Sequence, residues 1–295
     1  MLLREKLETT RFSSSERNVA NYLLETGLDL EKQTINAIAS ACYTVPSTLV
    51  RVAQKLGFSG WKDLKSAYLQ EERYLQQHFL NIDANRPFRA DDSIMQVASK
   101  LETLKEEALR DTLDLLEYPA LQQASDLLRK ARQIHLFGIS HNPLLAGKFA
   151  YDMRRIHKSV IGHTMPPDFL FDVRQAGPED CVLVISYTGE SVIINEVLKA
   201  CQEKHISTIA LTSIGENETS RLADCVLRIA TREKIYSKIG SFCTDTSVVY
   251  LLELLYACVF KVHYERNLQE KIRLSKATET RTHVDNQILK EDGTE

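Results

Sequence analysis

The second half of the chain repeats one pattern five times, a short apolar segment that ends at polar or glycine residues. These segments span residues 133–139, 158–162, 181–187, 207–213 and 225–230. Near-continuous apolar runs of this length are typical of strands that are buried on both faces of a parallel sheet. Helical segments lie between most of them, and strands that alternate with helices predict an α/β three-layer domain with a parallel sheet.

The first 80 residues lack this pattern and are predicted to be all-α. Ser13 and Glu16 have the spacing of a capping box, and Gly27 ends the helix that they begin. A short helix is expected over 35–42, and Pro46 begins another that runs towards "KLG". Two short helices joined by a tight turn, the second with a polar outer face, predict a helix-turn-helix.

A helix-turn-helix lays its second helix in the major groove of DNA, with the N-terminal residues of that helix near the base edges. This geometry makes Ser47, Thr48 and Arg51 the candidates for base contacts. Lys55 and Lys62 would meet DNA phosphates and set the salt dependence of binding. Ordinary packing of three helices with a solvated basic edge would give the same pattern.

Composition limits the other possibilities. The chain is 43% hydrophobic and 26% charged with a net charge of −3, so any nucleic-acid surface has to be local. Its six cysteines lack the spacing of a zinc or redox motif. We expect reduced buried thiols in a cytoplasmic protein, with no metal and no cofactor. The apolar run 248–262 carries Glu253 and is too short to span a bilayer, so we expect a buried helix and no membrane role.

We predict four parts along the chain. The stretch "NIDANRPFRADD" gathers Asn, Asp and Pro between two helical regions, and "KATETRTHVDNQILKEDGTE" at the end is polar and expected to be frayed. A long amphipathic helix is predicted over 93–117 and a second one from about Pro119 to Lys130. The parts are a helix-turn-helix domain (1–80), a linker and connecting helix (81–105), the α/β domain (106–265) and a polar C-terminal tail (266–295).

The third apolar segment, "CVLVISY", runs into a cluster of polar residues at the start of the next helix. Three hydroxyls flank a glycine there, and the first turn of a helix leaves backbone N–H groups unpaired. The helix dipole favours an anion at this end, so the cluster fits a phosphate monoester on a small molecule. Capping of the helix by Ser186 or Ser191 is the alternative, although it needs fewer hydroxyls than are present. The residues assigned to the phosphate site are Ser186, Tyr187, Thr188, Gly189 and Ser191.

The first apolar segment also ends on polar residues, in the stretch "FGISHN". Gly138 allows close approach of the backbone, and Ser140, His141 and Asn142 follow it. Ligands of open α/β sheets bind beyond the carboxyl ends of the strands. We therefore expect these three residues to complete the ligand site.

The segments "TINAIASACYTVPSTLVRVAQKLGFSGWKDLKSAY" and "GIS", "SYTGES" and "ALTS" of the second half together resemble the RpiR family of bacterial transcriptional regulators. The resemblance implies a helix-turn-helix domain followed by a sugar isomerase (SIS) domain of flavodoxin-like fold. It also implies operator DNA and a phosphorylated sugar or amino sugar as partners, and control of genes for carbohydrate uptake or catabolism.

The sequence departs from the family pattern at two places. The first loop of the family usually reads Gly-x-Gly-x-Ser, whereas Ser140 and Asn142 stand at the second glycine and the serine. In the helix-turn-helix, Tyr43 replaces the glycine of the turn and Val45 replaces the common capping serine. The turn then needs another way to adopt the left-handed conformation.

Two other functions remain open. A SIS-type sugar-phosphate isomerase or etherase would need a base near the sugar, and the candidates are Glu190, Glu233, His141 and His163. A sugar-phosphate sensor that acts on a protein partner would explain Tyr43. A regulator would be a homodimer or homotetramer, and the helices at 93–117 and 248–262 could supply its contact or be buried within one subunit.

Overall fold

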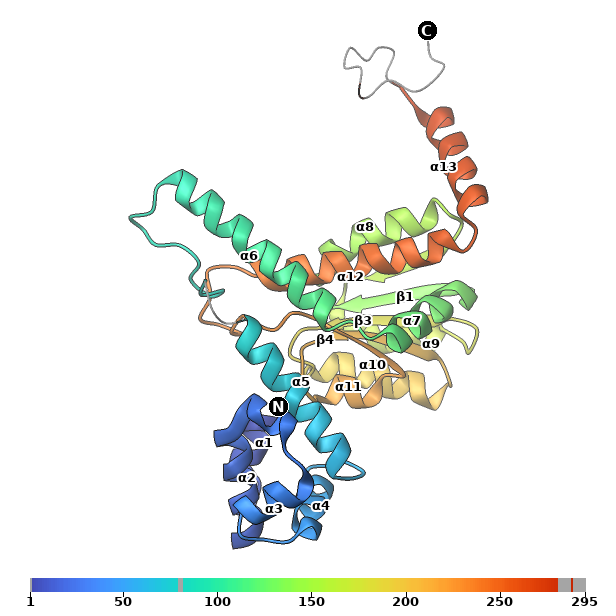
Figure 1. Ribbon diagram of the computed structural model, residues 1–295. Helices are drawn as coiled ribbons and strands as arrows, with labels where there is room; N and C mark the ends of the chain where they lie inside the picture. Colours follow the sequence, from blue (N-terminus) through green and yellow to red (C-terminus); the bar gives the residue numbers. More distant parts are fainter. Residues whose placement is uncertain (1, 79–81, 281–287, 289–295) are drawn as a thin grey trace.

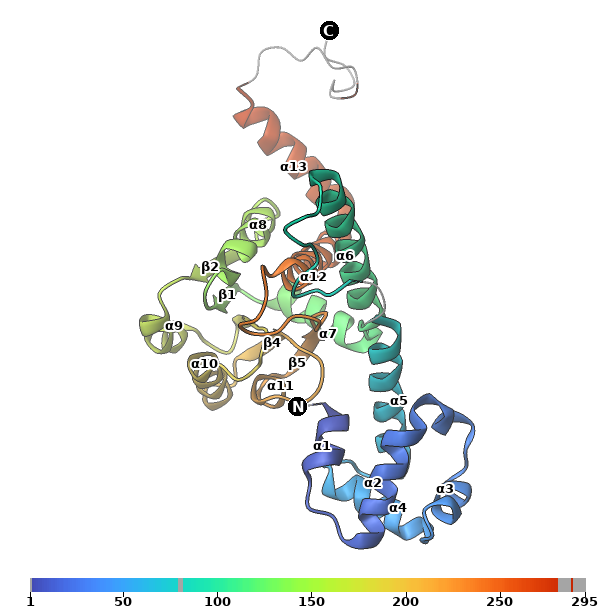
Figure 2. The same ribbon diagram turned by 90° about the vertical axis from the view of Figure 1, so that its left-hand side faces the viewer.

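A computed structural model describes residues 2–78, 82–280 and 288 of the chain (Figure 1). An all-helical N-terminal domain lies at one end of the molecule, and an α/β domain lies beside it. Helices α6 and α13 extend away from the sheet (Figures 1 and 2).

The N-terminal domain is built from short helices around one apolar core. Its elements are α1 (Leu3–Thr9), α2 (Ser14–Thr26), the 3₁₀ helix η1 (Gly27–Lys32), α3 (Ile35–Ala41), α4 (Pro46–Lys55) and α5 (Trp61–His78). The predicted capping box is present, because the Ser13 N–H donates to the Glu16 carboxylate at 2.8 Å. The Thr34 hydroxyl caps α3 through the Ala37 N–H at 3.2 Å. Apolar side chains of α1, α2, α4 and α5 then meet in a core with Leu7, Leu23 and Leu49 fully buried.

The α/β domain contains five parallel strands in the order β2-β1-β3-β4-β5. Their bounds are β1 (Gln133–Gly138), β2 (Ser159–His163), β3 (Cys181–Ser186), β4 (Ser207–Thr212) and β5 (Cys225–Arg228). All four pairings are parallel, and the five predicted strands are confirmed to within two residues at each end. All six residues of β3 are buried, in agreement with its central place in the sheet.

Helices cover both faces of this sheet. One face carries α7 (Tyr118–Lys130), α8 (Asn142–Arg154) and α12 (Phe242–Lys261), and α6 (Ile94–Asp114) packs against α12. The other carries η2 (Pro166–Asp168), α9 (Phe169–Gln175), α10 (Val192–Glu203) and α11 (Glu218–Leu222). Since β1 leads to α8 on one face and β3 leads to α10 on the other, the strand order reverses between β1 and β3. Open α/β sheets bind ligands at such a switch point.

Helix α12 is 20 residues long with a mean hydropathy of 1.4, which is long and apolar enough for a membrane span. Its residues Val248, Leu251, Leu252 and Leu255 are buried in the core of the domain. It also packs against α6, where the Thr112 hydroxyl donates to Ser247 Oγ at 2.7 Å. The core therefore accounts for the apolar face of α12, as expected for a buried helix.

The predicted linker and tail are only partly described. Residues 82–93 are irregular, and residue 81 lies outside the described residues. The predicted tail begins as a helix, because α13 covers Tyr264–Thr278. Most of the remaining tail, 281–287 and 289–295, also lies outside the described residues. The six cysteines are free thiols, five of them buried and Cys258 half-buried.

Candidate functional site

The DNA-facing candidate is the outer surface of α4. Ser47 and Arg51 are exposed there, and Lys62 is exposed at the start of α5. Neither Arg51 nor Lys62 forms an ion pair with a carboxylate in the described part of the chain. The N-cap residue Val45 gives no side-chain cap to the helix. In that first turn Pro46 has no N–H and the Thr48 N–H donates to Val45 O at 2.9 Å, which leaves the Ser47 N–H as the backbone donor for a phosphate oxygen.

The prediction that Thr48 faces outwards is wrong. Its side chain is 1% exposed, and its hydroxyl lies 2.8 Å from Thr44 Oγ1. The Arg51 guanidinium donates to the same hydroxyl at 3.0 Å. Helical periodicity placed Thr48 at the margin of the apolar face, and packing against the domain core turned it inwards. In this structure Thr48 orients Arg51 and does not itself offer a base contact.

Lys55 also has a partner inside the domain. Its ammonium lies 2.7 Å from Glu16 Oε2, and that hydrogen bond, together with the Ser13 N–H, lowers the pKa of Glu16 to about 2. Glu16 is buried at 4% exposure, whereas the Lys55 side chain keeps 44% of its surface exposed. Much of the charge of Lys55 is therefore offset before any phosphate approaches it.

The turn before α4 keeps the left-handed conformation without a glycine. Tyr43 has φ 53°, and its side chain is 94% exposed. The Thr44 N–H donates to Ala39 O at 2.8 Å, which closes the turn over the end of α3. Because the Tyr43 ring lies in solvent and does not pack in the core, tyrosine in place of the usual glycine leaves the helix-turn-helix geometry intact.

The ligand-facing candidate is the phosphate loop, defined as Tyr187–Ser191 between β3 and α10. Ser191 is the N-cap of α10, yet its hydroxyl makes no capping hydrogen bond. The capping alternative for Ser191 is therefore not what the structure shows. Ser186 is buried at the end of β3, and the Thr188 hydroxyl accepts the Glu190 N–H at 3.2 Å. The loop thus combines hydroxyls with the positive end of a twelve-residue helix.

The phosphate loop is held by the segment that follows β4. The Ser213 N–H donates to Tyr187 O at 3.1 Å, and the Thr219 N–H donates to Gly189 O at 2.9 Å. Gly189 has φ +70°, and a Cβ placed on it would lie 2.0 Å from Asn217 Cγ. A glycine is therefore needed there both for the backbone conformation and for the close contact.

Tyr187 faces the interior. Its hydroxyl donates to Glu233 O at 2.8 Å, accepts the Glu233 N–H at 3.1 Å, and is half-buried. Glu233, a candidate base that lies in the polar run "TREK", is buried at 6% exposure. Its carboxylate accepts the Cys243 N–H at 2.7 Å and the Thr244 hydroxyl at 2.5 Å at the start of α12. Glu233 is therefore engaged with a helix N-terminus, where its negative charge is stabilised.

The first loop, Ile139–His141, lies at the adjacent strand end. Ser140 has φ 60°, so it keeps the backbone conformation of the glycine that it replaces in the family pattern. Asn142 is buried and donates to Ile185 O of β3 at 3.3 Å, which joins the ends of the two strands. Its amide nitrogen is therefore part of the scaffold. His141 remains accessible, with Nε2 2.7 Å from Asp245 Oδ1.

The other two candidate bases, His163 and Glu190, have different surroundings. His163 ends the edge strand β2, stacks on Phe137 with ring centroids 4.3 Å apart, and pairs with Asp172 at 2.8 Å. The carboxylate of Glu190 accepts the Glu218 N–H at 3.3 Å. His141 and the exposed Glu190 are thus the sequence-predicted bases that the structure leaves accessible at the switch point.

Three residues near the site were missed by sequence reasoning. Asn217 contacts Gly189, Asp245 pairs with His141, and Lys238 lies 5.5 Å from the centre of the Tyr187 ring while forming an ion pair with Glu233 at 3.4 Å. Asn217 starts α11 with a side-chain cap on the Ser220 N–H, and "N-x-x-S" spacing could have predicted that cap. Nothing local in the sequence predicts the other two contacts.

Two segments of the chain match models of known families. Residues 1–74 match the model of the helix-turn-helix domain of the rpiR family, and residues 127–257 match the model of the SIS domain. The HTH-type transcriptional regulator YbbH of Bacillus subtilis is 26% identical over 252 residues, which cover 85% of this chain and 87% of that protein.

Among the solved structures that share the fold, two are informative. One is the Vibrio vulnificus NanR protein complexed with ManNAc-6P, with a TM-score of 0.58 and 21% identity, covering 95% of this chain and 100% of NanR. The other is a putative sugar-phosphate isomerase from Listeria monocytogenes, with a TM-score of 0.54 and 14% identity, covering 62% of this chain and 98% of the isomerase. The first similarity extends through both domains, whereas the second covers less than two thirds of this chain.

Proposed function

Because the chain belongs to the rpiR family of helix-turn-helix transcriptional regulators and carries a SIS domain, we propose that a phosphorylated sugar or amino sugar modulates its binding to operator DNA. The genes under control would serve uptake or catabolism of that sugar, and the protein would act in the cytoplasm. The observation that carries the proposal is the phosphate loop, where the Ser191 hydroxyl stands at a helix N-terminus without capping it.

The phosphate would be held by Ser186, Thr188 and Ser191, by the backbone N–H groups around Gly189, and by the dipole of α10. The sugar ring would then extend towards the first loop, where His141 and Asp245 offer polar atoms at the adjacent strand end. Hydrogen bonds to sugar hydroxyls from such a fixed pair would favour one sugar over another.

A thermal-shift panel of sugar and amino-sugar phosphates, with ManNAc-6P included, tests this site. A ligand that binds the folded form alone raises Tm with its excess over Kd. The Ser186→Ala/Ser191→Ala double variant is expected to lose the shift and to keep its operator affinity without effector. An unchanged shift in the double variant would refute the assignment of the loop.

Operator DNA would be read by Ser47 and Arg51 of α4, with Lys62 on a phosphate. An electrophoretic shift with the DNA upstream of the protein's own gene tests this surface. Arg51→Ala is expected to weaken specific binding by about 10- to 100-fold, the range of one lost base contact, and to leave the thermal shift with sugar phosphate unchanged. Loss of effector binding in this variant would refute the assignment of DNA binding to the N-terminal domain and effector binding to the SIS domain.

An operator with two half-sites calls for a homodimer or homotetramer. Helix α6 supports this proposal, because Ile94, Met95, Leu109 and Leu113 are exposed along it. Sedimentation at several protein concentrations tests it, and a monomer at all of them would contradict the proposed mode of DNA reading.

The pair His141–Asp245 favours a second candidate, a SIS-type isomerase or etherase. A histidine that is oriented by a carboxylate is a common general base. Incubation of the protein with the phosphates of the same panel, followed by chromatography of the products, separates the two functions. Turnover that disappears in His141→Gln would establish the enzyme, and intact substrates would favour the regulator.

A further inference from the structure

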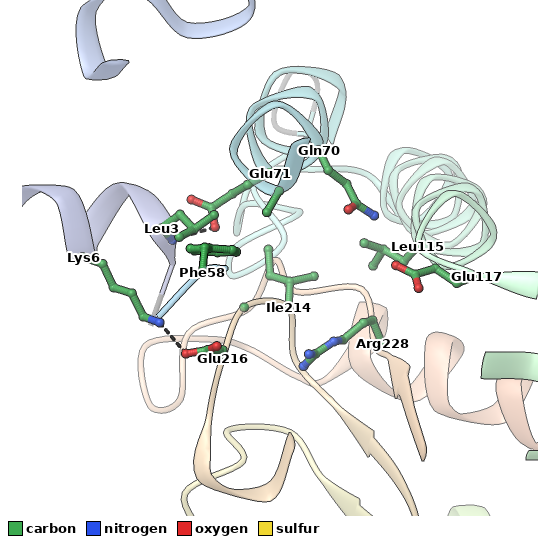
Figure 3. Close-up of a pocket in the computed structure, with 12 residues that line it drawn as sticks. Leu3, Lys6, Phe58, Gln70, Glu71, Leu115, Glu117, Ile214, Glu216 and Arg228 are labelled. Carbon is green, nitrogen blue, oxygen red and sulfur yellow. Dashed lines mark hydrogen bonds and ion pairs between the residues drawn. The ribbon is translucent and has the colours of Figure 1, made fainter. Parts of the chain in front are cut away.

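One short loop touches both domains. It is the segment Ser213–Asn217 between β4 and α11, called the coupling loop below. Figure 3 shows its residues Ile214 and Glu216 beside Leu3, Lys6 and Phe58 of the N-terminal domain. The Lys6 ammonium and the Glu216 carboxylate form an ion pair across this contact. The lowered pKa of Glu216 agrees with that pairing.

The other side of the coupling loop lies on the phosphate loop. The Ser213 N–H donates to Tyr187 O, and the Asn217 side chain packs against Gly189 without room for a Cβ. Just beyond the coupling loop, the Thr219 N–H donates to Gly189 O. If the phosphate loop shifts when an anion binds, the Asn217 side chain that contacts Gly189 therefore has to move with it.

Asn217 and Glu216 are adjacent, and the first half of the coupling loop is anchored. Arg228 donates to Ser213 O at 2.8 Å, and the Ile214 N–H donates to Thr231 Oγ1 at 3.0 Å. Gly215, with φ 78°, separates this anchored half from Glu216 and Asn217. A glycine in this conformation lets Glu216 reorient while the first half stays on β5. Asn217 is buried, donates to Thr212 Oγ1 and accepts the Ser220 N–H, so it would move together with the start of α11. Movement of Asn217 is thereby passed to the carboxylate that holds Lys6.

The contact between the domains leaves space for such movement. A cavity of about 250 Å³ adjoins the ion pair and is lined on the N-terminal side by Leu3, Phe58 and Ala67, and on the other side by Leu115 and Ile214. Because the apolar side chains around it are not in full contact, a small shift of α1 costs less than it would in a close-packed core.

We propose that the coupling loop transmits occupancy of the phosphate loop to the DNA-binding domain, with Asn217 and Glu216 as positioning residues and Lys6 as the contact on α1. This inference rests on the proposed function. Because coupling between two sites is reciprocal, operator binding would also change the affinity for the sugar phosphate by the same factor.

The test measures the coupling factor, the ratio of operator Kd with and without effector, by fluorescence anisotropy. The effector is ManNAc-6P or the member of the panel with the largest thermal shift. Lys6→Glu and Glu216→Lys are each expected to reduce the coupling factor by about two- to fivefold, which is the range of a partly exposed ion pair. The double variant, with the charges exchanged, is expected to restore it. Effector Kd from calorimetry stays within about twofold in all three, since neither residue lies in the phosphate loop.

Glu179→Lys is the matched control. Glu179 forms an exposed ion pair with Arg132 beside the amino end of β3, away from both the phosphate loop and α1. An unchanged coupling factor in the Lys6 and Glu216 variants, a double variant that stays uncoupled, or an equal loss in the control would each overturn the inference. Failure of the wild-type protein to bind either partner would instead overturn the proposed function, and the inference with it.

Discussion

The close contact between Gly189 and Asn217 makes a quantitative prediction for Gly189→Ala. The new methyl group would lie 2.0–2.6 Å from three atoms of the Asn217 side chain, so Asn217 has to move. It would lose its cap on the Ser220 N–H and its hydrogen bond to Thr212 Oγ1 at 3.1 Å. Each loss costs about 1 kcal/mol. The left-handed backbone of residue 189 adds about 1 kcal/mol for alanine.

The expected loss of stability is therefore roughly 3 kcal/mol. Asn217→Ala alone removes the cap and the hydrogen bond and is expected to cost about 2 kcal/mol. In the double variant the clash is absent and the strain at residue 189 remains, so its cost is also roughly 3 kcal/mol, not the sum of about 5. The prediction is therefore an interaction free energy of about −2 kcal/mol between the two substitutions in a double-mutant cycle.

Urea unfolding followed by two probes measures these values separately for the two domains. The single tryptophan, Trp61, lies in the core of the N-terminal domain, whereas far-ultraviolet circular dichroism reports on both domains. Gly189→Ala is expected to move the circular-dichroism transition and leave the fluorescence transition in place. Gly147→Ala, at an exposed and uncrowded site within α8, serves as control and is expected to stabilise by about 1 kcal/mol. Strictly additive costs for Gly189 and Asn217 would refute the reasoning.

Other predictions concern single contacts. Arg232→Met removes the guanidinium that pairs with the buried Asp111 carboxylate and is expected to cost about 3–5 kcal/mol by circular dichroism, whereas a loss below about 1 kcal/mol would show that solvent reaches the pair. Glu16 has its pKa lowered from 4.5 to about 2, so its contribution to stability is complete above pH 4.5 and is lost as the pH falls towards 2. In Glu16→Gln the urea midpoint of the Trp61 fluorescence transition should depend less on pH between 2 and 4.5. An equally strong pH dependence in this variant would show that the pair of Glu16 with Lys55 is not its cause. Tyr43→Gly is expected to raise the midpoint of the same transition by relieving about 1 kcal/mol of strain, and a lower midpoint would mean that the exposed ring contributes to the fold.

The sequence was sufficient for the elements and the sheet because their causes are local or periodic. Apolar runs such as "CVLVIS" can be buried on both faces only in a covered parallel sheet, and the capping pair Ser13–Glu16 fixes a helix start by direct contact. The phosphate loop followed from the same logic, as polar residues at a strand end. In each case the residues that determine the structure are neighbours along the chain.

The sequence-based predictions are wrong or incomplete where contacts with residues distant in the sequence determine the position of a side chain. Glu233 lies in the polar run "TREK" but is buried, because the start of α12 offers it two donors ten and eleven residues away. Thr48 lies on the margin of the apolar face of α4, and only the packing of the whole domain decides on which side it falls. The contact of Asn217 with Gly189 joins two loops that follow different strands, and it needs the register of β3 with β4. Periodicity carries none of this information.

The two departures from the family pattern carry a further consequence for recognition. Ser140 and Tyr43 both keep a left-handed backbone, with φ 60° and 53°, although the side chain makes that conformation cost about 1 kcal/mol. The geometry at these turns is therefore imposed by the surrounding fold. Asn142 in turn uses its amide to hold β3, so the first loop does not supply the hydroxyl of the family pattern. If the phosphate is gripped by the β3 side alone, discrimination between sugars falls to His141 and its partner on α12. His141→Gln should then change the order of the sugar phosphates in the thermal-shift panel, while loss of Ser191 should weaken all of them alike.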